Sequence, residues 1–367
     1  MKAYTLKKPL ARSLYENIRE EIVTRSIKPG TRLPSKREIA SRFSLSLITV
    51  EHALDQLESE GFIEARERSG TYVLPQPSYR SSKEDPFEIR LLAEEPLSAS
   101  DDDFPSSLWY KTLRHVISME GDRLLQKSPP KGCAKLRNAI AEYLYRARGM
   151  QVQPEQVIVS SGAESLYQII LKMFPGSISI GIEDPGYAQI ERIYKAHQVR
   201  IQKLRMKSDG IDSGDLASCN AGFLHVTPFL SYPSRITASA AKRHEYLEWA
   251  YDHQAWILED DFNSEFFQSG PLLPTLYALD HNDQVIYMNT FSKSLSPSLR
   301  TGYMVLPEKL LPLYEEKAGM YSNTVPLLEQ YTLAEFISSG SFERLLSRKR
   351  RKLAGQPKEA LSSDPDR

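Results

Sequence analysis

A lysine surrounded by hydroxyl side chains is the feature of this sequence that most directly suggests chemistry. Lys293 lies close to Thr290 and Ser292, and Arg300 follows seven residues later. The amine of a lysine can form a Schiff base with an aldehyde, and hydroxyl and guanidinium groups can bind a phosphate. These four residues therefore predict a site for a ligand that carries both an aldehyde and a phosphate.

Other polar residues supply what such a ligand also needs. Ser161, Gly162 and Ala163 follow an apolar run and open a helical pattern, and the free N–H groups at a helix start bind anions. Asp260 also follows an apolar run, and a carboxylate there can pair with a pyridinium nitrogen and keep it protonated. Tyr187 offers a ring that can stack on an aromatic ligand. Together these residue types predict a site for pyridoxal phosphate.

The elements that must position these residues are strands that alternate with helices. Six apolar runs have the length and composition of strands: residues 157–159, 178–182, 223–226, 256–258, 285–288 and 303–306. Their alternation with helical patterns predicts an α/β domain with a doubly wound, mostly parallel sheet. Ligands bind such sheets beyond the carboxyl ends of the strands. Asp260, Lys293 and the Gly162 segment each follow a strand, so they are expected to converge there.

The N-terminal part of the chain predicts a second domain of three helices and a hairpin. The first helix is expected to end near residues 28–30. Ser35 and Glu38 form a capping-box pattern at the start of the second helix, and Ser46 can cap the third. Two short strands around a Ser-Gly turn follow in residues 62–73. This pattern predicts a winged helix-turn-helix, whose third helix enters the DNA major groove. A small helical protein-interaction domain is the alternative.

Composition supports two domains joined by a linker. At 367 residues the chain is longer than an average domain. Residues 1–75 carry 13 Lys and Arg against 10 Asp and Glu, a net charge of 13 − 10 = +3, which is a weak sign of nucleic-acid binding. Residues 76–103 lose their periodicity and contain prolines, serines and a run of Asp, so they predict a flexible tether. Residues 104–367 form the second predicted domain.

Several other classes of protein do not fit the sequence. Cys133 and Cys219 are too few for a disulfide framework, which fits a reducing cytosol and predicts a cytoplasmic protein. No apolar run reaches the roughly 18–20 residues that a bilayer span needs, and the N-terminus lacks the apolar core of a signal peptide. The histidines show no metal-ligand spacing, so no metal site is predicted.

The N-terminal domain resembles the DNA-binding domain of the GntR family along its whole length. The matching positions are residues 29–35, 37–40, 49–50, 54, 57, 61–63 and 70–71. The resemblance implies that DNA is contacted by Arg32, Ser35, Arg37, Thr49, Arg66 and Gly70. Arginine can pair with phosphate or guanine, and backbone amides can meet phosphates. Where the family usually has a polar residue, this chain has Leu47 and Ile48, which cannot read guanine but can contact a thymine methyl group.

Residues 104–343 resemble fold-type I aminotransferases, and most closely the effector domain of MocR-type regulators. That subfamily of GntR regulators joins a winged helix-turn-helix to an aminotransferase-like domain. The matching segments include residues 161–163, 183–187, 226–228, 259–261 and 290–293. The resemblance implies a transcriptional regulator that binds double-stranded DNA as a homodimer and binds pyridoxal phosphate, together with an amino compound, as its effector.

The sequence departs from the family pattern at positions that concern the cofactor. Leu230 and Ser231 stand where the family has His-Gln, and Leu230 has no polar side chain for the cofactor. Phe262 stands where the family has a tyrosine that bonds the ring oxygen, a loss of about 1 kcal/mol. The chain also ends before the small subdomain of its relatives, which usually supplies an arginine for a substrate carboxylate. The basic residues 348–352 are expected to begin the helix that leads into that subdomain, and a DNA-binding tail is the alternative.

Three functions remain open from the sequence. The predicted one is a regulator whose DNA affinity is set by pyridoxal phosphate and an amine. A working aminotransferase with a DNA-binding appendage is disfavoured by Leu230, Phe262 and the missing subdomain, because transamination needs a held carboxylate and an enclosed site. A degenerate domain that only dimerises and binds no cofactor is the third.

Overall fold

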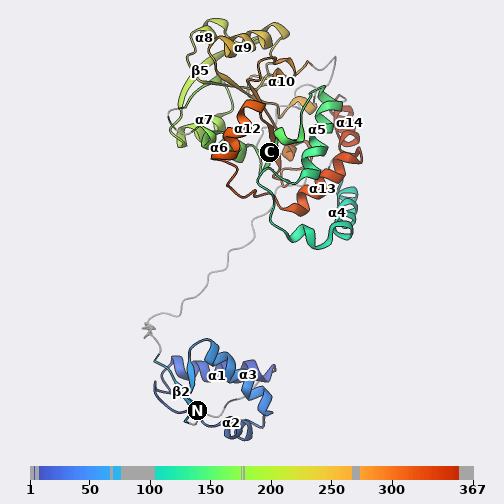
Figure 1. Ribbon diagram of the computed structural model, residues 1–367. Coiled ribbons are helices and arrows are strands. Elements are labelled where there is room, and N and C mark those ends of the chain that lie inside the picture. Colours follow the sequence, from blue (N-terminus) through green and yellow to red (C-terminus); the bar gives the residue numbers. More distant parts are fainter. Residues whose placement is uncertain are drawn as a thin grey trace. The chain divides into compact units, whose positions relative to one another are not determined.

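The computed structural model describes residues 4, 8–66, 69–75, 104–174, 176, 178–266 and 273–354 (Figure 1). The chain divides into two units, Met1–Pro96 and Leu97–Arg367, and each is described by itself. The predicted linker, residues 76–103, lies outside the described residues, as does the tail from residue 355 onward.

The N-terminal unit has the predicted winged helix-turn-helix. Its elements are α1 (Leu10–Val23), α2 (Lys36–Phe43), α3 (Leu47–Ser59), β1 (Ile63–Arg66) and β2 (Gly70–Val73). The capping box is present, because the Glu38 N–H donates to Ser35 Oγ at 3.3 Å and the Ser35 N–H donates to the Glu38 carboxylate at 2.6 Å. Ser46 caps α3 by accepting the Thr49 N–H at 3.1 Å. The wing is the antiparallel pair of β1 and β2.

The first helix is shorter than predicted. It ends at Val23 rather than near residues 28–30. Arg25 has a φ of 56°, and the N–H groups of Thr24 and Arg25 return to carbonyls of the last turn of α1. This is the geometry of a helix C-cap, which glycine usually provides. The helix was expected to end at Pro29 and Gly30. It ends earlier because Arg25 takes the left-handed position that a glycine usually occupies.

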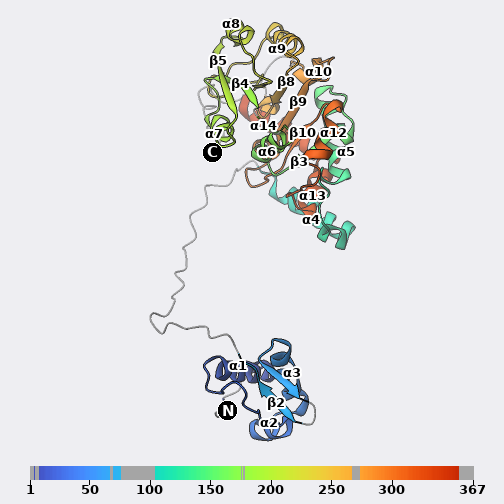
Figure 2. The ribbon, with the colours of Figure 1, turned by 60° about the vertical axis from the view of Figure 1, so that its left-hand side comes forward.

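An eight-stranded sheet forms the centre of the C-terminal unit (Figure 2). In chain order its strands are β3 (Val157–Ser160), β4 (Ser179–Asp184), β5 (Arg200–Lys207), β6 (Gly210–Ile211), β7 (Phe223–Val226), β8 (Trp256–Asp260), β9 (Val285–Thr290) and β10 (Gly302–Val305). Their spatial order is β3-β10-β9-β8-β7-β4-β5-β6. The pairs from β9 through β5 are parallel, whereas β10 is antiparallel to both of its neighbours. The predicted mostly parallel sheet is confirmed.

All six predicted strands are present, and β5 and β6 are additional. Only Leu204 is fully buried along β5, so that strand has no apolar run by which it could be recognised. The β5 strand pairs with β4 on one side and with the two residues of β6 on the other. A strand near the end of a sheet buries little of its surface, which leaves a weak signal in the sequence.

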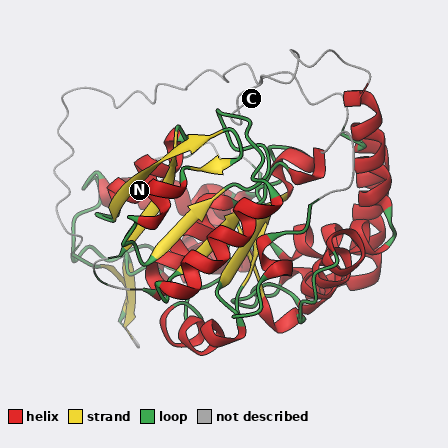
Figure 3. Cartoon of the chain, turned by 90° about the horizontal axis from the view of Figure 1, so that it is seen from above, coloured by secondary structure: helices red, strands yellow, loops and turns green. Residues whose placement is uncertain are grey.

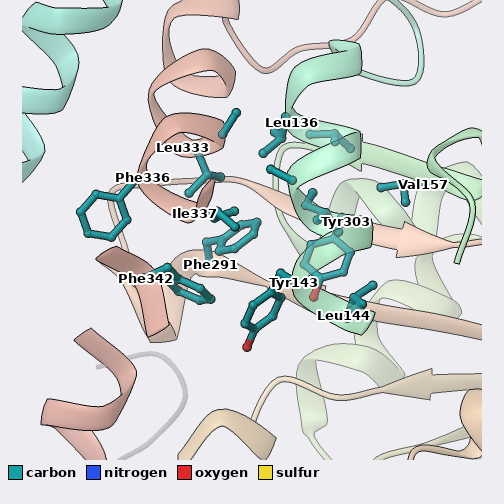
Figure 4. Packing of buried hydrophobic residues seen from close by; sticks show 14 of the residues in the cluster. Leu136, Tyr143, Leu144, Val157, Phe291, Tyr303, Leu333, Phe336, Ile337 and Phe342 are labelled. Atoms are coloured by element: carbon teal, nitrogen blue, oxygen red, sulfur yellow. The ribbon is translucent and has the colours of Figure 1, made fainter. Parts of the chain in front are cut away.

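Helices cover both faces of the sheet (Figure 3). The helices of this unit are α4 (Ser106–Glu120), α5 (Ala134–Arg148), α6 (Ala163–Met173), α7 (Ala188–Ala196), α8 (Ser213–Ala217), α9 (Ala240–Asp252), α10 (Leu276–Leu279), α11 (Phe291–Ser294), α12 (Leu311–Lys317), α13 (Leu327–Ser338) and α14 (Ser341–Ala354). Ile158, Met288 and Met304 pack with α6, α7 and α12. The alternate residues Val157 and Tyr303 pack with α5, α13 and α14, as Figure 4 shows. This period of two gives the doubly wound arrangement.

The basic residues 348–352 lie within α14, but that helix begins at Ser341 and not, as had been expected, at the basic run. Phe342, Leu345 and Leu346 of α14 are buried in the same core as α5 and α13. Arg350 Nε donates to the backbone carbonyl of Glu265 at 2.6 Å.

Among the described residues, no helix is both long and apolar enough to cross a lipid bilayer.

The core of the winged helix provides a test of the fold that is confined to one helix. Leu57 is fully buried, whereas Leu47 of the same helix is 48% exposed. We expect Leu57→Ala to destabilise the N-terminal unit by about 2–5 kcal/mol, because it leaves a cavity among α1, α3 and β1. The measurement is amide hydrogen exchange of peptides from residues 10–73, which reports on this unit alone.

Leu47→Ala is the matched control and should change exchange by no more than about 0.5 kcal/mol. Equal effects of the two substitutions would contradict the packing described above.

Candidate functional site

Six strands end at one edge of the sheet, here called the carboxyl edge: β3, β4, β5, β7, β8 and β9. The register aligns them, since Ser160 and Thr290 both lie opposite Gly302, and Met288 lies opposite Asp260. Because β10 is antiparallel to both neighbours, it begins at this edge while β3 and β9 end there. The segments that follow Ser160, Asp260 and Thr290 are the ones in which the sequence predicted a cofactor site.

Two glycines allow the segments of the carboxyl edge to approach one another. Gly162 has φ 87° and ψ 178°, a conformation essentially restricted to glycine. A Cβ there would lie 3.2 Å from Arg300 Nη2. A Cβ on Gly302 would lie 3.1 Å from Thr290 Cγ2 and 3.3 Å from Gly162 Cα. Gly162, Thr290 and Arg300 are thus brought together at the N-terminus of α6, and Ala163 is the first residue of that helix.

The hydroxyl groups of this region already have partners within the protein. Ser161 Oγ lies 2.8 Å from Ser165 Oγ and accepts a hydrogen bond from Thr324 Oγ1 at 2.8 Å. Ser292 Oγ donates to the carbonyl of Leu299 at 3.3 Å. These predicted phosphate ligands lie beside Gly162 and Lys293. Ser161 Oγ can accept from both Thr324 and Ser165 and keep its own proton for a phosphate, whereas Ser292 would have to give up its bond to Leu299.

Asp260 is a buried carboxylate with aromatic partners. Its Oδ2 accepts a hydrogen bond from the Tyr167 hydroxyl at 2.5 Å and lies 3.7 Å from His225 Nε2. Burial and the negative charge of Asp260 raise the pKa of Tyr167 well above its usual value, so the phenol remains a donor. The His225 Nδ1 atom pairs with the Tyr194 hydroxyl at 2.7 Å. Tyr167, Tyr194 and His225 were not predicted from the sequence, although a histidine within the apolar run of β7 is an available signal.

Lys293 is a largely buried amine in α11. Its Nζ donates to Asn263 Oδ1 at 2.6 Å and lies 5.6 Å from the centre of the Phe262 ring. Burial lowers the pKa of Lys293, the positive charge of Arg235 lowers it further, and Glu265 opposes the shift. A lower pKa increases the neutral fraction of the amine, which is the form that attacks an aldehyde.

The loop after β7 is joined to this lysine through one asparagine. Asn263 Nδ2 donates to the backbone carbonyl of Leu230 at 3.0 Å, while the Oδ1 atom of the same side chain accepts from Lys293. Tyr232 of this loop packs edge-on against Tyr187, with ring centroids 6.0 Å apart. The predicted stacking residue Tyr187 therefore lies at the carboxyl edge, next to an aromatic ring that the sequence analysis did not select.

Two further buried carboxylates hold elements around the site. Glu183 accepts the Thr227 N–H at 3.0 Å and the Ser231 hydroxyl at 2.5 Å. Burial raises the pKa of Glu183 to about 7, and these hydrogen bonds oppose the shift. Asp261 forms a buried ion pair with Arg148 at the end of α5. Both acids fix backbone and helix positions, and neither was selected from the sequence.

The predicted DNA contacts fall on the wing and on the starts of α2 and α3. The Arg32 side chain packs against Gly70 of the wing, where a Cβ would lie 2.5 Å from Arg32 Nε. Arg66 lies over the Tyr72 ring at 4.8 Å and pairs with Glu64 at 2.9 Å. The structure therefore brings Arg32, which lies between α1 and α2, against Gly70 and Arg66 of the two-stranded wing.

The remaining three predicted contacts belong to the helix starts. Ser35 is the capping residue of α2, and Arg37 is exposed in its first turn. Thr49 lies in the first turn of α3, where its N–H and hydroxyl both meet Ser46 Oγ. Thr49 also lines a surface depression of about 670 Å³ together with Ile48 and His52.

The exposed side of α3 is unusual for a helix that meets DNA. Its sequence contains no lysine or arginine. Leu47 is 48% exposed and Ile48 is 68% exposed in its first turn. Glu51 of the next turn forms an ion pair with Lys36 of α2 at 2.6 Å. Any cation near this helix therefore comes from neighbouring elements.

Comparison with known proteins gives the family. Residues 10–73 match the family of bacterial regulatory proteins of the gntR type, and residues 91–354 match aminotransferase class I and II. The chain is 36% identical to the HTH-type transcriptional regulator YdeL of Bacillus subtilis, over 95% of this chain and 77% of that protein. It is 32% identical to the probable rhizopine catabolism regulatory protein MocR of Rhizobium meliloti, over 95% of this chain and 76% of the other. The chain belongs to the MocR-type subfamily of GntR regulators.

Solved structures agree with the fold of the second domain of this MocR-type regulator. It superposes on a kynurenine aminotransferase of Pyrococcus horikoshii with a TM-score of 0.62 and 22% identity, over 68% of this chain and 64% of that one. The α-aminoadipate aminotransferase LysN of Thermus thermophilus gives a TM-score of 0.61 and 26% identity, over 69% and 65%. The predicted combination of a winged helix-turn-helix with an aminotransferase fold is confirmed.

The environment of Lys293 in the MocR-type regulator predicts an unusual titration. We expect its amine to lose its proton at a lower pH than exposed lysines, because burial and Arg235 both disfavour the charged form. Arg235→Gly should shift the midpoint upward, since one positive neighbour is removed. The measurement is a ¹³C NMR titration of labelled lysine side chains, with Lys293→Ala to assign the signal. A Lys293 midpoint equal to that of exposed lysines would contradict this account.

Proposed function

We propose that this MocR-type regulator binds pyridoxal phosphate at the carboxyl edge and binds DNA through its winged helix, and that cofactor and ligand binding set its DNA affinity. The observation that carries the proposal is the meeting of Lys293, Asp260 and the Gly162–Arg300 contact at one edge of one sheet. A primary amine, a buried carboxylate and a cradle for an anion are the three groups that this cofactor needs.

The residues present fit the cofactor. Arg300 and the N-terminus of α6 can hold its phosphate, because Gly162 leaves that space free of a side chain. Asp260 can pair with its ring nitrogen, and Tyr167 keeps the carboxylate oriented through Oδ2. Lys293 can bond its aldehyde. Pyridoxal phosphate would supply reversible bonding to primary amines and an electron-withdrawing ring.

The comparisons support this assignment. The LysN structure, 26% identical to this chain, was solved as a complex with N-(5'-phosphopyridoxyl)-L-leucine. One relative is named the HTH-type pyridoxine biosynthesis transcriptional regulator PdxR of Corynebacterium glutamicum, and it is 30% identical over 92% of this chain. The relatives that match both domains are named as transcriptional regulators, which favours regulation over turnover.

Exposed apolar side chains on two neighbouring elements of the C-terminal unit support a homodimer. These side chains, on α4 and on η1 (Gly121–Leu125), are Leu108, Tyr110, Ile117, Met119 and Leu125. Their exposed fractions range from 40% to 85%. At about 100° per residue, Leu108 and Met119 share one side of α4, and Tyr110 and Ile117 share the opposite side. Either side could pack against a second copy of the chain. A dimer would present two winged helices to two half-sites of DNA.

Cofactor binding is tested by absorbance. We expect pyridoxal phosphate to give a visible band with the full-length protein and Lys293→Ala to abolish that band. Gly162→Ala should weaken the affinity about tenfold or more, because the added Cβ lies against Arg300 and the backbone is strained. The measurement is a titration of the band against cofactor concentration.

Gly149→Ala is the matched control. Gly149 also has a positive φ, 66°, but its Cβ would meet nothing within 4 Å. This variant should lower stability while leaving cofactor affinity unchanged. A wild-type protein that gives no band would refute cofactor binding at this site.

DNA binding is tested by its salt dependence. If 6–10 phosphates are contacted, affinity should fall by about 10³–10⁵ between 50 and 200 mM salt. Arg37→Ala should weaken binding to every sequence and reduce the magnitude of the salt slope by about one, as loss of one phosphate contact requires. Arg192→Ala, at an exposed position of α7, serves as the charge control. A salt-independent affinity would argue against DNA as the partner.

The apolar start of α3 predicts how the DNA sequence is read. After selection of a binding site from random DNA, each thymine is replaced singly by uracil, which removes only the C5 methyl group. We expect one or two replacements to weaken binding several-fold, because Leu47 and Ile48 can contact a thymine methyl. Ile48→Ala should bind more weakly and lose its sensitivity at one of these positions. Indifference of the wild-type protein to every methyl group would contradict this reading.

A further inference from the structure

The loop between β7 and α9 is fixed at the carboxyl edge by buried side chains. Glu183 accepts the Ser231 hydroxyl at 2.5 Å, and Asn263 donates to the Leu230 carbonyl at 3.0 Å. Arg243, itself buried, donates to the carbonyls of Pro228 at 2.8 Å and of Ala238 at 3.1 Å. Both ends of the loop are therefore held, and residues 229–236 have a defined position beside Lys293.

Two residues of this loop have a left-handed backbone conformation that a side chain disfavours: Leu230, with a φ of 49°, and Arg235. Arg235 has a φ of 59°, and its N–H donates to the Ser231 carbonyl, which closes a turn. A left-handed conformation costs free energy for every residue with a Cβ, and glycine avoids that cost. Strained backbone persists where the surrounding structure enforces it, and such positions cluster at ligand sites.

Most other residues with this conformation have an explanation that Arg235 lacks. Among the described non-glycine residues, six others also have positive φ: Arg25, Ser44, Gln198, Leu230, Gln254 and Asp283. All of these except Leu230 and Asp283 lie at the C-terminal end of a helix, where a left-handed residue closes the helix hydrogen bonds. Arg235 ends no helix, so helix termination does not account for an arginine there.

The guanidinium of Arg235 is exposed and available. Within the described residues it forms no ion pair, whereas Arg148 pairs with Asp261, and Arg243 and Arg350 are bound to backbone carbonyls. The positive charge of Arg235 acts on Lys293, whose pKa it lowers. Asn263 links the lysine to the loop that carries the arginine, so both residues belong to segments that meet at the carboxyl edge.

We propose that Arg235 binds the carboxylate of an amino-acid ligand whose amine is received at the Lys293 end of the site. The inference rests on the proposed cofactor function and names the class of its effector: a primary amine that also carries a carboxylate. A guanidinium can hold a carboxylate through two parallel hydrogen bonds, which fixes the orientation of the ligand as well as its charge. The rigid loop keeps the arginine in place before the ligand arrives.

The proposal explains why the strained residue is not a glycine. Arg235→Gly removes the strain, so the variant should be more stable than the wild-type protein, with a higher melting temperature. The same variant should lose its preference for carboxylated amines. A substitution that stabilises the protein but weakens ligand binding indicates that the original residue is retained for the ligand.

The experiment uses full-length protein loaded with pyridoxal phosphate. Pairs of amines that differ only in the carboxylate are titrated: alanine with ethylamine, β-alanine with propylamine, and γ-aminobutyrate with butylamine. Affinity is read from the change in the visible band and, independently, from calorimetry. We expect the wild-type protein to bind at least one carboxylated member roughly tenfold or more tightly than its partner. In Arg235→Gly this ratio should fall to about one, and Arg235→Lys should retain part of it.

Control variants separate the outcomes. Arg200→Gly removes an exposed arginine at the start of β5, the opposite end of that strand from the carboxyl edge, and should leave the ratio unchanged. If the wild-type protein gives no visible band, the cofactor function itself fails. If the band forms but Arg235→Gly keeps the wild-type ratio, only the role of Arg235 is overturned. Loss of the band in Arg235→Gly would also overturn it, since the residue would then serve the cofactor.

Discussion

The close approach of Gly162 and Gly302 is the contact on which the site depends. Gly302 begins β10, which is antiparallel to β3 and β9 and so starts where both neighbours end. A side chain on Gly302 would meet Thr290 and the Cα of Gly162, and a side chain on Gly162 would meet Arg300. In the proposed site, these two glycines let the N-terminus of α6, Thr290 and Arg300 approach closely enough to hold one anion. Sheet topology brings the segments to one edge, and the absence of two Cβ atoms lets them converge.

Desolvation sets the chemistry of the charged groups at this edge. Asp260 is 3% exposed and retains its place through Tyr167, whose own pKa is raised by burial and by that carboxylate. Burial disfavours the charged form of Glu183 and raises its pKa to about 7. The hydrogen bonds from Ser231 and Thr227 act in the opposite direction, because they favour the charged form. At pH values between the ordinary pKa of a glutamate and about 7, Glu183 is protonated in the folded chain and ionised in the unfolded chain. This contribution to stability therefore decreases as pH rises through that interval.

The sequence was most informative where one local interaction decides the structure. Ser35 and Ser46 could be identified as caps because each bonds an amide three residues later. The end of α1 two residues before Arg25 and the strain at Arg235 were not predictable, since nothing in the residue type marks an arginine for left-handed backbone. Tyr167 and His225 escaped selection because they join Asp260 only through the register of α6, β7 and β8. Partners from distant segments leave no spacing signal, whereas the residues that follow strands do.

The two departures from the family pattern meet at one residue. Leu230 offers its carbonyl to Asn263, Phe262 precedes Asn263 in the chain, and Lys293 donates to the same asparagine. Replacing polar side chains by Leu230 and Phe262 removes hydrogen bonds from a cofactor, each worth about 1 kcal/mol. The same replacement makes the surroundings of Lys293 less polar, and desolvation is the main reason for its lowered pKa. Under the proposed function, a site altered in this way would keep a neutral, reactive amine and hold its cofactor less tightly. Such a balance would allow reversible occupancy, which the proposed role as a sensor requires.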